Sequence, residues 1–263
     1  MNVTTMSQCL ATKQACKELN LTEQSNLSKT NVIQARLKNN QHELIHQVFT
    51  AIQENKPEYA VLEIPKVSRQ KILASLKKQF SNQYYINYEI YNTKDFQLSQ
   101  GRMFTLVILS KIGLEQPNMP FRTGENGLGV NSIMNKHVAS KYYIYEEFFS
   151  YPSQYVSSGV KRIGVIKIDN DISLSQCRRV YSSSHKSCSL QSTSGGWGAK
   201  TGIYETEFGY RILTPHECFK LQGIEYKDLR ASDSKKYLLI NNSMCYPVIL
   251  FALMNIKKLF DIK

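Results

Sequence analysis

The residues best suited to chemistry in this chain are basic side chains in its second half. Residues 159–200 carry seven Lys or Arg against two acidic residues. The seven are Lys161, Arg162, Lys167, Arg178, Arg179, Lys186 and Lys200. Beside Ser, Thr and Gln, such cations suit contacts with phosphates and base edges. The whole chain has 33 Lys and Arg against 21 Asp and Glu, a net charge of +12, which favours an acidic partner such as nucleic acid.

The six cysteines lack the spacing of a metal site or a disulfide framework. They contain no C-x-x-C pair, and those with a histidine close by are Cys188 and Cys218, near His185 and His216. A zinc site needs a second such pair at short spacing. We therefore expect reduced thiols and no metal.

The glycines are distributed unevenly. All 13 lie at or after Gly101 in a chain of 263 residues. Loops that bring the backbone close to a phosphate or nucleoside are rich in glycine, so the first hundred residues cannot contain one. The chain is therefore not expected to supply the usual cofactor loop.

The elements that must position these residues begin near Leu44. Apolar side chains at helical spacing predict helices over 44–56 and 68–80. Residues 59–65 predict a short buried strand, and 84–91 and 103–109 are two further strand candidates. Alternating helices and strands indicate an α/β sheet. Thr214 is expected to cap a further helix, with Pro215 first, Glu217 third and an end at Gly223. A final apolar helix is predicted over 247–260.

Composition divides the chain into segments. Residues 1–40 contain no Gly, Pro, Phe, Trp or Tyr, which predicts a weakly ordered N-terminal arm. Residues 116–210 turn to Gly, Ser, Tyr and short alternating stretches, typical of a separate, mostly β domain. No apolar run reaches the roughly 20 residues of a membrane span, and no signal segment begins the chain. We therefore expect a soluble, cytoplasmic protein with no membrane partner.

Two segments near the C-terminus carry a family resemblance. Residues 211–223 read R-I-L-T-P-H-E-C-F-K-L-Q-G. They resemble the R-x-L-T-P-R-E-x-x-x-L-Q-G segment of DNA (cytosine-5) methyltransferases at eight of nine fixed positions. Residues 240–248, I-N-N-S-M-C-Y-P-V, are similar to the I-G-N-S-V-x-x-P-V block of the same family.

Other segments extend the resemblance over residues 41–256. Ala60-Val-Leu-Glu63 resembles the strand that ends in Glu-Asn-Val, and Gln100-Gly-Arg102 resembles Q-x-R-x-R. Gln176 to Tyr181, Ser189-Leu190 and residues 195–202 are similar to the target-recognition domain of HhaI-like enzymes. The resemblance implies an incomplete Rossmann-like methyltransferase sheet from 41–115 and 240–263. It also implies a small, mostly β target-recognition domain with a hinge at 116–239.

The family chemistry implies roles for particular residues. A cysteine thiolate adds to C6 of a flipped-out cytosine, whose C5 then takes the methyl group of S-adenosylmethionine. By resemblance Glu63 is the carboxyl at N3 and Arg102 the cation at O2, where each stabilises the charge pushed onto the ring. The resemblance further assigns DNA contacts and cofactor contacts. The DNA residues are Gln176, Arg179, Ser189 and Lys200; the cofactor residues are Asn242 and Ser243.

The departures from the family pattern are equally specific. Residues 20–28, where the Pro-Cys-Gln nucleophile loop is expected, contain no cysteine, and Cys16 lacks the flanking proline and glutamine. The F-x-G-x-G cofactor loop is missing. Glu63 is followed by Ile64-Pro65 instead of Asn-Val, Phe104 replaces the second Arg, and Asn241 replaces a Gly.

Three hypotheses account for this pattern. The first is a recognition subunit of a two-chain, restriction-modification type methyltransferase acting on double-stranded DNA. Its partner chain would carry F-x-G-x-G and Pro-Cys-Gln and would make most of the contacts with S-adenosylmethionine. The isolated chain would be inactive, and the protein would be cytoplasmic and associated with the nucleoid. The second is a non-catalytic DNA-binding or regulatory relative, or a degenerate fragment. The third is a frameshifted gene with the missing motifs in the preceding reading frame.

Overall fold

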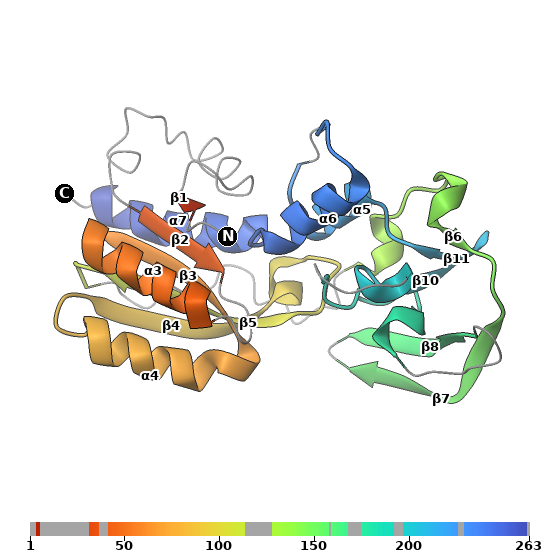
Figure 1. Cartoon of the computed structure of the whole chain (residues 1–263), viewed down its shortest axis with the longest axis horizontal. Helices are drawn as coiled ribbons and strands as arrows, with labels where there is room; N and C mark the ends of the chain where they lie inside the picture. Colours follow the sequence, from red (N-terminus) through yellow and green to blue (C-terminus); the bar gives the residue numbers. More distant parts are fainter. Residues whose placement is uncertain are drawn as a thin grey trace. The chain divides into compact units, whose positions relative to one another are not determined.

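Alternating helices and strands in the first half of the chain build a five-stranded sheet (Figure 1). The computed structural model describes residues 4–5, 32–36, 42–113, 128–157, 159–167, 175–191, 197–225 and 229–261. The strands are ordered β1-β2-β3-β5-β4, and β2 runs parallel to β3, while β5 is antiparallel to both β3 and β4. Their bounds are β1 Thr4–Thr5, β2 Val32–Arg36, β3 Tyr59–Pro65, β4 Tyr85–Asn92 and β5 Met103–Ser110.

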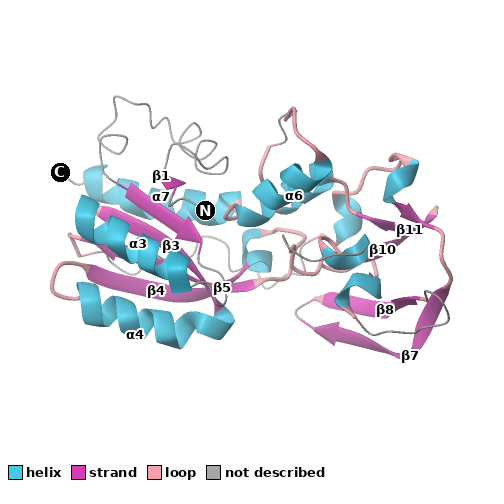
Figure 2. Cartoon of the chain, in the orientation of Figure 1, coloured by secondary structure: helices cyan, strands magenta, loops and turns pink. Residues whose placement is uncertain are grey.

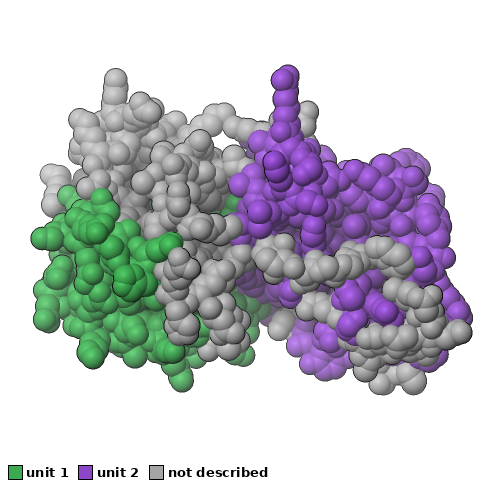
Figure 3. Space-filling model, viewed as in Figure 1, with its two compact units in different colours: residues 1–92, 103–122, 243–263 green, residues 93–102, 123–242 purple. Residues whose placement is uncertain are grey.

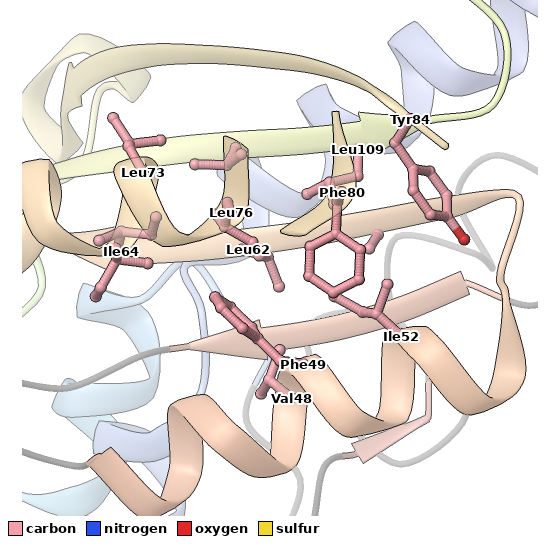
Figure 4. Close-up of a cluster of buried hydrophobic side chains, with 13 residues drawn as sticks. Val48, Phe49, Ile52, Leu62, Ile64, Leu73, Leu76, Phe80, Tyr84 and Leu109 are labelled. Atoms are coloured by element: carbon pink, nitrogen blue, oxygen red, sulfur yellow. The ribbon is translucent and has the colours of Figure 1, made fainter. Parts of the chain in front are cut away.

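Two helices cover one face of this sheet because their apolar residues fall on one side. Helices α3 (His42–Asn55) and α4 (Arg69–Phe80) meet β3 and β5 in a buried cluster (Figure 4). Phe49 of α3 and Phe80 of α4 pack edge to face, with ring centroids 5.4 Å apart. The cluster includes Val48, Ile52, Leu62, Ile64, Ile72, Leu73, Leu76, Val107 and Leu109. The predictions for these helices and strands are confirmed.

The expectation of a weakly ordered arm over residues 1–40 is wrong for residues 32–36. This stretch forms β2, which pairs with β3 from Val32 opposite Tyr59 to Arg36 opposite Glu63. Val32 and Ile33 are β-branched, and such residues favour a strand. The polar composition of the surrounding residues concealed this short signal.

The middle of the chain forms a second, six-stranded sheet with the order β6-β11-β10-β9-β8-β7. The expectation of strands in this region is confirmed. Among the described pairs of this sheet, β9 and β10 are parallel and the other pairs are antiparallel. One face carries the buried cluster of Ile144, Ile166, Val180 and Ile203. The bounds are β6 Tyr143–Ile144, β7 Phe148–Ser157, β8 Val160–Ile166, β9 Arg179–Tyr181, β10 Ile203–Thr206 and β11 Gly209–Ile212.

Helices return after the second sheet (Figure 2). They are α5 (Pro215–Leu221), α6 (Asp233–Asn242) and α7 (Tyr246–Asp261). The predicted cap of α5 is confirmed as a complete capping box of Thr214 and Glu217, with Pro215 at the first position. The predicted final helix is confirmed as α7, which packs on the first sheet with the ring of Phe251 5.8 Å from that of Tyr91.

The chain divides into two compact units (Figure 3). Unit 1 holds residues 1–92, 103–122 and 243–263, and unit 2 holds residues 93–102 and 123–242. Residues 93–102 therefore belong with the second sheet, unlike in the predicted division. Short 3-10 turns lie at 66–68, 93–96, 130–132, 140–142, 176–178 and 197–199.

One stretch, Asp233–Ile256, is long and apolar enough to cross a membrane by length and composition. Residues 243–245 interrupt it between α6 and α7. Of its most apolar window, 67% is buried within the molecule. This burial is typical of core helices, so the stretch is weak evidence for a membrane span.

Candidate functional site

Glu63 lies in the middle of the first sheet. It occupies the fifth position of β3, opposite Arg36 of β2 and Leu106 of β5, and it is 2% exposed. Side chains alternate across a strand. Because Leu62 and Ile64 point into the α3–α4 cluster, Glu63 points to the opposite face of the sheet. A carboxyl group in such a place is positioned by the sheet itself.

Arg102 directly precedes β5, at the end of the segment that belongs to unit 2. The segment closes on itself, because the amide of Thr93 donates to the Arg102 carbonyl at 2.9 Å and the amide of Arg102 donates to Thr93 Oγ1 at 3.0 Å. The Arg102 side chain is half-buried. The structure thus assigns Glu63 and Arg102 to different units.

Phe104 stands where the Q-x-R-x-R motif has its second arginine. It is 1% exposed and its ring centroid lies 6.0 Å from that of Tyr91. The position therefore holds a core aromatic residue, and an arginine there would have to be buried.

Arg179 begins β9 and pairs with Val165 of β8. Its side chain is half-buried. Two residues further, Tyr181 is 3% exposed, and burial raises its pKa to about 12 although the nearby Arg162 and Arg179 oppose this shift. The two guanidinium groups are therefore close to one phenol. Gln176 lies in the preceding 3-10 turn, and its side chain is outside what the structure describes.

Arg162 is a candidate DNA contact that the resemblance did not assign. It pairs with Tyr181 of β9 on one side and Tyr155 of β7 on the other. Its guanidinium lies 5.3 Å from the ring centroid of Tyr155, which is 56% exposed. An arginine on an exposed ring is a common platform for phosphates and bases. The excess of basic residues was the signal in the sequence that could have found it.

The remaining predicted DNA residues, Ser189 and Lys200, are both half-buried in unit 2. The ammonium of Lys200 lies 3.4 Å from Ser234 Oγ and 5.5 Å from the ring centroid of Tyr237, both on α6. Its carbonyl accepts from the amide of Gln191 at 2.9 Å. Lys200 thus also links the second sheet to α6.

Lys186 departs from the expected DNA face over residues 159–200. It is 5% exposed, and its ammonium donates to the carbonyls of Leu98 and Leu128. A buried ammonium bonded to main-chain carbonyls cannot contact a phosphate on the surface. Charge counting along the sequence did not distinguish this buried cation from its exposed neighbours.

The segment 211–217 is built around a buried ion pair. Arg211 and Glu217 are 1% and 0% exposed in their side chains, and Nη1 and Nη2 of Arg211 donate to the two carboxylate oxygens at 2.9 and 2.8 Å. The carboxylate also accepts from the amides of Thr214 and Asn135, at 2.7 and 2.6 Å. The arginine of this motif therefore joins β11, α5 and the loop at Asn135.

A family model for C-5 cytosine-specific DNA methylases matches residues 27–258. The chain belongs to this family. No curated protein sequence matches it.

Solved methyltransferases have a similar fold. The Entamoeba histolytica methyltransferase EhMeth has a TM-score of 0.61 at 14% identity, over 96% of this chain and 88% of that one. The S. pombe Dnmt2 methyltransferase gives 0.59 at 12%, over 87% and 77%. A putative DNA modification methyltransferase encoded within an E. coli prophage gives 0.57 at 12%, over 88% and 79%. The predicted fold class, α/β with a Rossmann-like methyltransferase sheet, is confirmed.

Enzymes of this methylase family generally use S-adenosylmethionine, and the two predicted cofactor residues lie where α6 ends and the turn to α7 begins. Asn242 is the last residue of α6 and is half-buried, while Ser243 is 5% exposed. The chain has no glycine before Gly101 that could form a backbone cradle.

Two of the described cysteines, Cys188 and Cys218, are poor nucleophiles for this family's chemistry. Burial raises the pKa of the Cys188 thiol, whose Sγ donates to the Thr201 carbonyl at 3.3 Å, and burial raises the pKa of Cys218 well above its usual range. Attack requires a thiolate, which these thiols rarely form. Cys16 lies outside the described residues.

Proposed function

We propose that this chain is the DNA-recognition and partial active-site subunit of a two-chain DNA (cytosine-5) methyltransferase of the restriction-modification type. A partner would bring the F-x-G-x-G and Pro-Cys-Gln segments and bind most of the S-adenosylmethionine. The substrate would be double-stranded DNA, and the complex would be cytoplasmic and associated with the nucleoid.

One observation carries the proposal: Glu63 is held in the sheet, while residues 20–28, which the family pattern gives to the nucleophile loop, contain no cysteine. The chain leaves β2 at Arg36, the residue opposite Glu63, and continues Leu-Lys-Asn-Asn-Gln through residue 41. The described thiols of Cys188 and Cys218 are kept neutral by burial. A sheet with the ring-stabilising carboxyl but without the nucleophile suits a shared active site.

In this proposal the chain's own residues bind and polarise the base. The Glu63 carboxyl donates a hydrogen bond to N3 of the flipped cytosine, and Arg102 binds O2. Both interactions strengthen as a nucleophile adds to C6, because the ring then gains negative charge. Arg179, Gln176, Ser189 and Lys200 hold the surrounding duplex.

The test is a reconstitution. The chain is purified with and without the product of a neighbouring gene, and transfer of a labelled methyl group from S-adenosylmethionine to DNA is measured. We expect activity from the pair and none from the chain alone. Activity of the isolated chain, or inactivity of every pair, would refute the proposal.

Glu63→Gln tests the role of the carboxyl within an active pair. The variant should lower kcat at least 100-fold, because the amide cannot supply the acidic proton to N3. Glu58→Gln, at an exposed carboxyl just before β3, is the matched control and should leave kcat unchanged. DNA affinity of both variants should match the wild type.

A second candidate is a non-catalytic DNA-binding or regulatory relative. The buried Phe104 in place of an arginine favours it, because this side of the base site has lost a cation. Such a protein would bind DNA, and Glu63→Gln would change nothing measurable.

A further inference from the structure

Lys186 is buried in unit 2, where a lone ammonium would be costly. Its Nζ donates to the carbonyl of Leu98 at 2.8 Å and to that of Leu128 at 3.1 Å. Its amide donates to the Gly159 carbonyl at 2.9 Å, and its Cγ would lie 2.9 Å from a Cβ added to Gly159. Burial, followed by repulsion from Lys94, lowers the pKa of Lys186. The lysine is therefore fixed at both its stem and its charged end.

The main chain next to Lys186 is hydrogen-bonded to the segment that contains Leu98. The Ser187 amide donates to the Ser99 carbonyl at 2.8 Å, and the Gly101 amide donates to the Ser187 carbonyl at 3.2 Å. These bonds form a parallel bridge between Gln100 and Ser187. Residues 98–101 are thus tied to residues 186–187 through main chain and ammonium together.

The side chains of Gln100 and Ser187 do not contribute to this attachment. Gln100 is 0% exposed, and within the described part of the chain neither atom of its amide group has a hydrogen-bond partner. The same holds for the buried hydroxyl of Ser187. The side-chain hydrogen bond from residue 186 or 187 to this segment is therefore the one made by the Lys186 ammonium.

The tied segment leads directly to Arg102. Thr93 Oγ1 donates to the Gln100 carbonyl at 2.6 Å and accepts from the Arg102 amide at 3.0 Å. The carbonyl of Arg102 in turn accepts from the Thr93 amide. Displacement of residues 98–100 would consequently displace the backbone of Arg102.

We propose that Lys186 is a positioning residue for Arg102. It fastens the Leu98–Gln100 segment to the loop that follows β9, so that Arg102 is carried by unit 2, the unit to which the proposed function gives DNA binding. The catalytic consequence rests on the function proposed above, whereas the attachment itself does not.

The attachment is tested in the isolated chain with Lys186→Met, which keeps the length of the side chain and removes the ammonium. Amide hydrogen exchange at Gly101, Arg102 and Ser187 should become at least tenfold faster. Exchange in the β10–β11 pair should stay as in the wild type, which shows that the sheet is folded. Unchanged exchange at Gly101 and Arg102 would overturn the proposal.

Lys111→Met is the matched control. Lys111 also donates to a backbone carbonyl, that of Lys56 at 2.6 Å, but it is exposed and belongs to unit 1. Exchange at Gly101 and Arg102 should be unaffected. If Lys186→Met does not fold, Lys186→Gln, whose amide can still donate to one carbonyl, takes its place, and an exchange rate equal to the wild type would again overturn the proposal.

The effect of Lys186 on catalysis is tested in the active pair of chains. Lys186→Met should lower kcat at least tenfold while the Kd for DNA stays within about threefold, because Arg102 acts on the flipped base and not on the duplex. An equal loss of DNA affinity would show that Lys186 serves recognition and not Arg102. If the wild-type pair transfers no methyl group, the proposed function fails, and exchange at Arg102 still decides the attachment.

Discussion

Arg211 and Glu217 show that a motif residue can be structural. Each is almost completely buried, and each has its hydrogen-bonding groups occupied by the other and by the main chain. A buried charge without its partner is costly, whereas a matched apolar pair is tolerated. This pair therefore fixes the path from β11 into α5.

Arg211→Met should lower the free energy of unfolding of unit 2 by about 3 to 5 kcal/mol, because the Glu217 carboxylate stays buried without its partner. The double variant Arg211→Met/Glu217→Leu should recover part of that loss. Urea denaturation gives both values. Lys167→Met serves as control, since its pair with Glu147 is exposed on the carboxylate side and should contribute about 1 kcal/mol or less.

Tyr181 predicts how stability depends on pH. Burial raises its pKa from 10.0 to about 12, so between these values the folded phenol keeps a proton that the unfolded one has lost. Stability should fall as pH rises through this window, by up to about 3 kcal/mol. Tyr181→Phe should show a shallower fall between pH 10 and 12 in denaturation at several pH values. Tyr145→Phe, at a phenol 81% exposed, is the control.

At the scale of elements, the pairing of β7 with β8 depends on the absence of a side chain. A Cβ on Gly164 would lie 2.2 Å from the Phe149 carbonyl oxygen and 2.4 Å from the ring of Phe148. That ring is stacked on Tyr210, with centroids 4.6 Å apart, so it cannot simply rotate away. The β7–β8 edge of the second sheet therefore requires glycine at this position.

Gly164→Ala should destabilise unit 2 by about 1 to 3 kcal/mol, because the β7 backbone must shift. Thermal unfolding followed by circular dichroism measures the effect. Gly113→Ala, where the nearest atoms to an added Cβ are 3.9 Å away, should be close to neutral. Equal stability of the two variants would contradict the described packing of β7 on β8.

On the scale of the whole molecule, the net charge of +12 is expected to act through particular surfaces. Lys186 and Arg211 are buried cations with structural partners, while Arg162 lies on the exposed ring of Tyr155. DNA affinity should therefore depend on a subset of the basic residues. Arg162 and Arg179, which face the same phenol from β8 and β9, are the first of these.

Arg162→Ala should weaken DNA binding and reduce the slope of log K against log salt by about 1, because one phosphate contact is lost. The slope is measured by fluorescence anisotropy at salt concentrations between about 50 and 200 mM, where DNA affinity falls steeply with salt. Lys136→Ala, an exposed lysine paired with Glu207, is the control for general charge. An unchanged slope for Arg162→Ala would exclude Arg162 from the DNA interface.

Several helices, a helix cap and the protein family could be predicted from the sequence alone, because they depend on patterns of residues that are close together in the chain. Helical spacing located α3, α4 and α7, and Thr214-Pro215 with Glu217 predicted the cap of α5. The motif segments from Glu63 to Ser243 indicated the methylase family. The strand at Val32–Arg36 was not predicted, because its five residues lie within a long polar stretch and its partner strand β3 is distant in the chain.

The tertiary structure decided what each charged residue does. In the order of the family motifs, Arg102 comes directly after the motif of Glu63. Hydrogen bonds between residues 98–101 and 186–187 nevertheless place Arg102 in the other unit. Lys186 and Arg162 are equivalent in a count of charges, but one is buried against carbonyls and the other lies on an exposed ring. Burial and long-range hydrogen bonds depend on residues far apart in sequence, so only the fold could distinguish them.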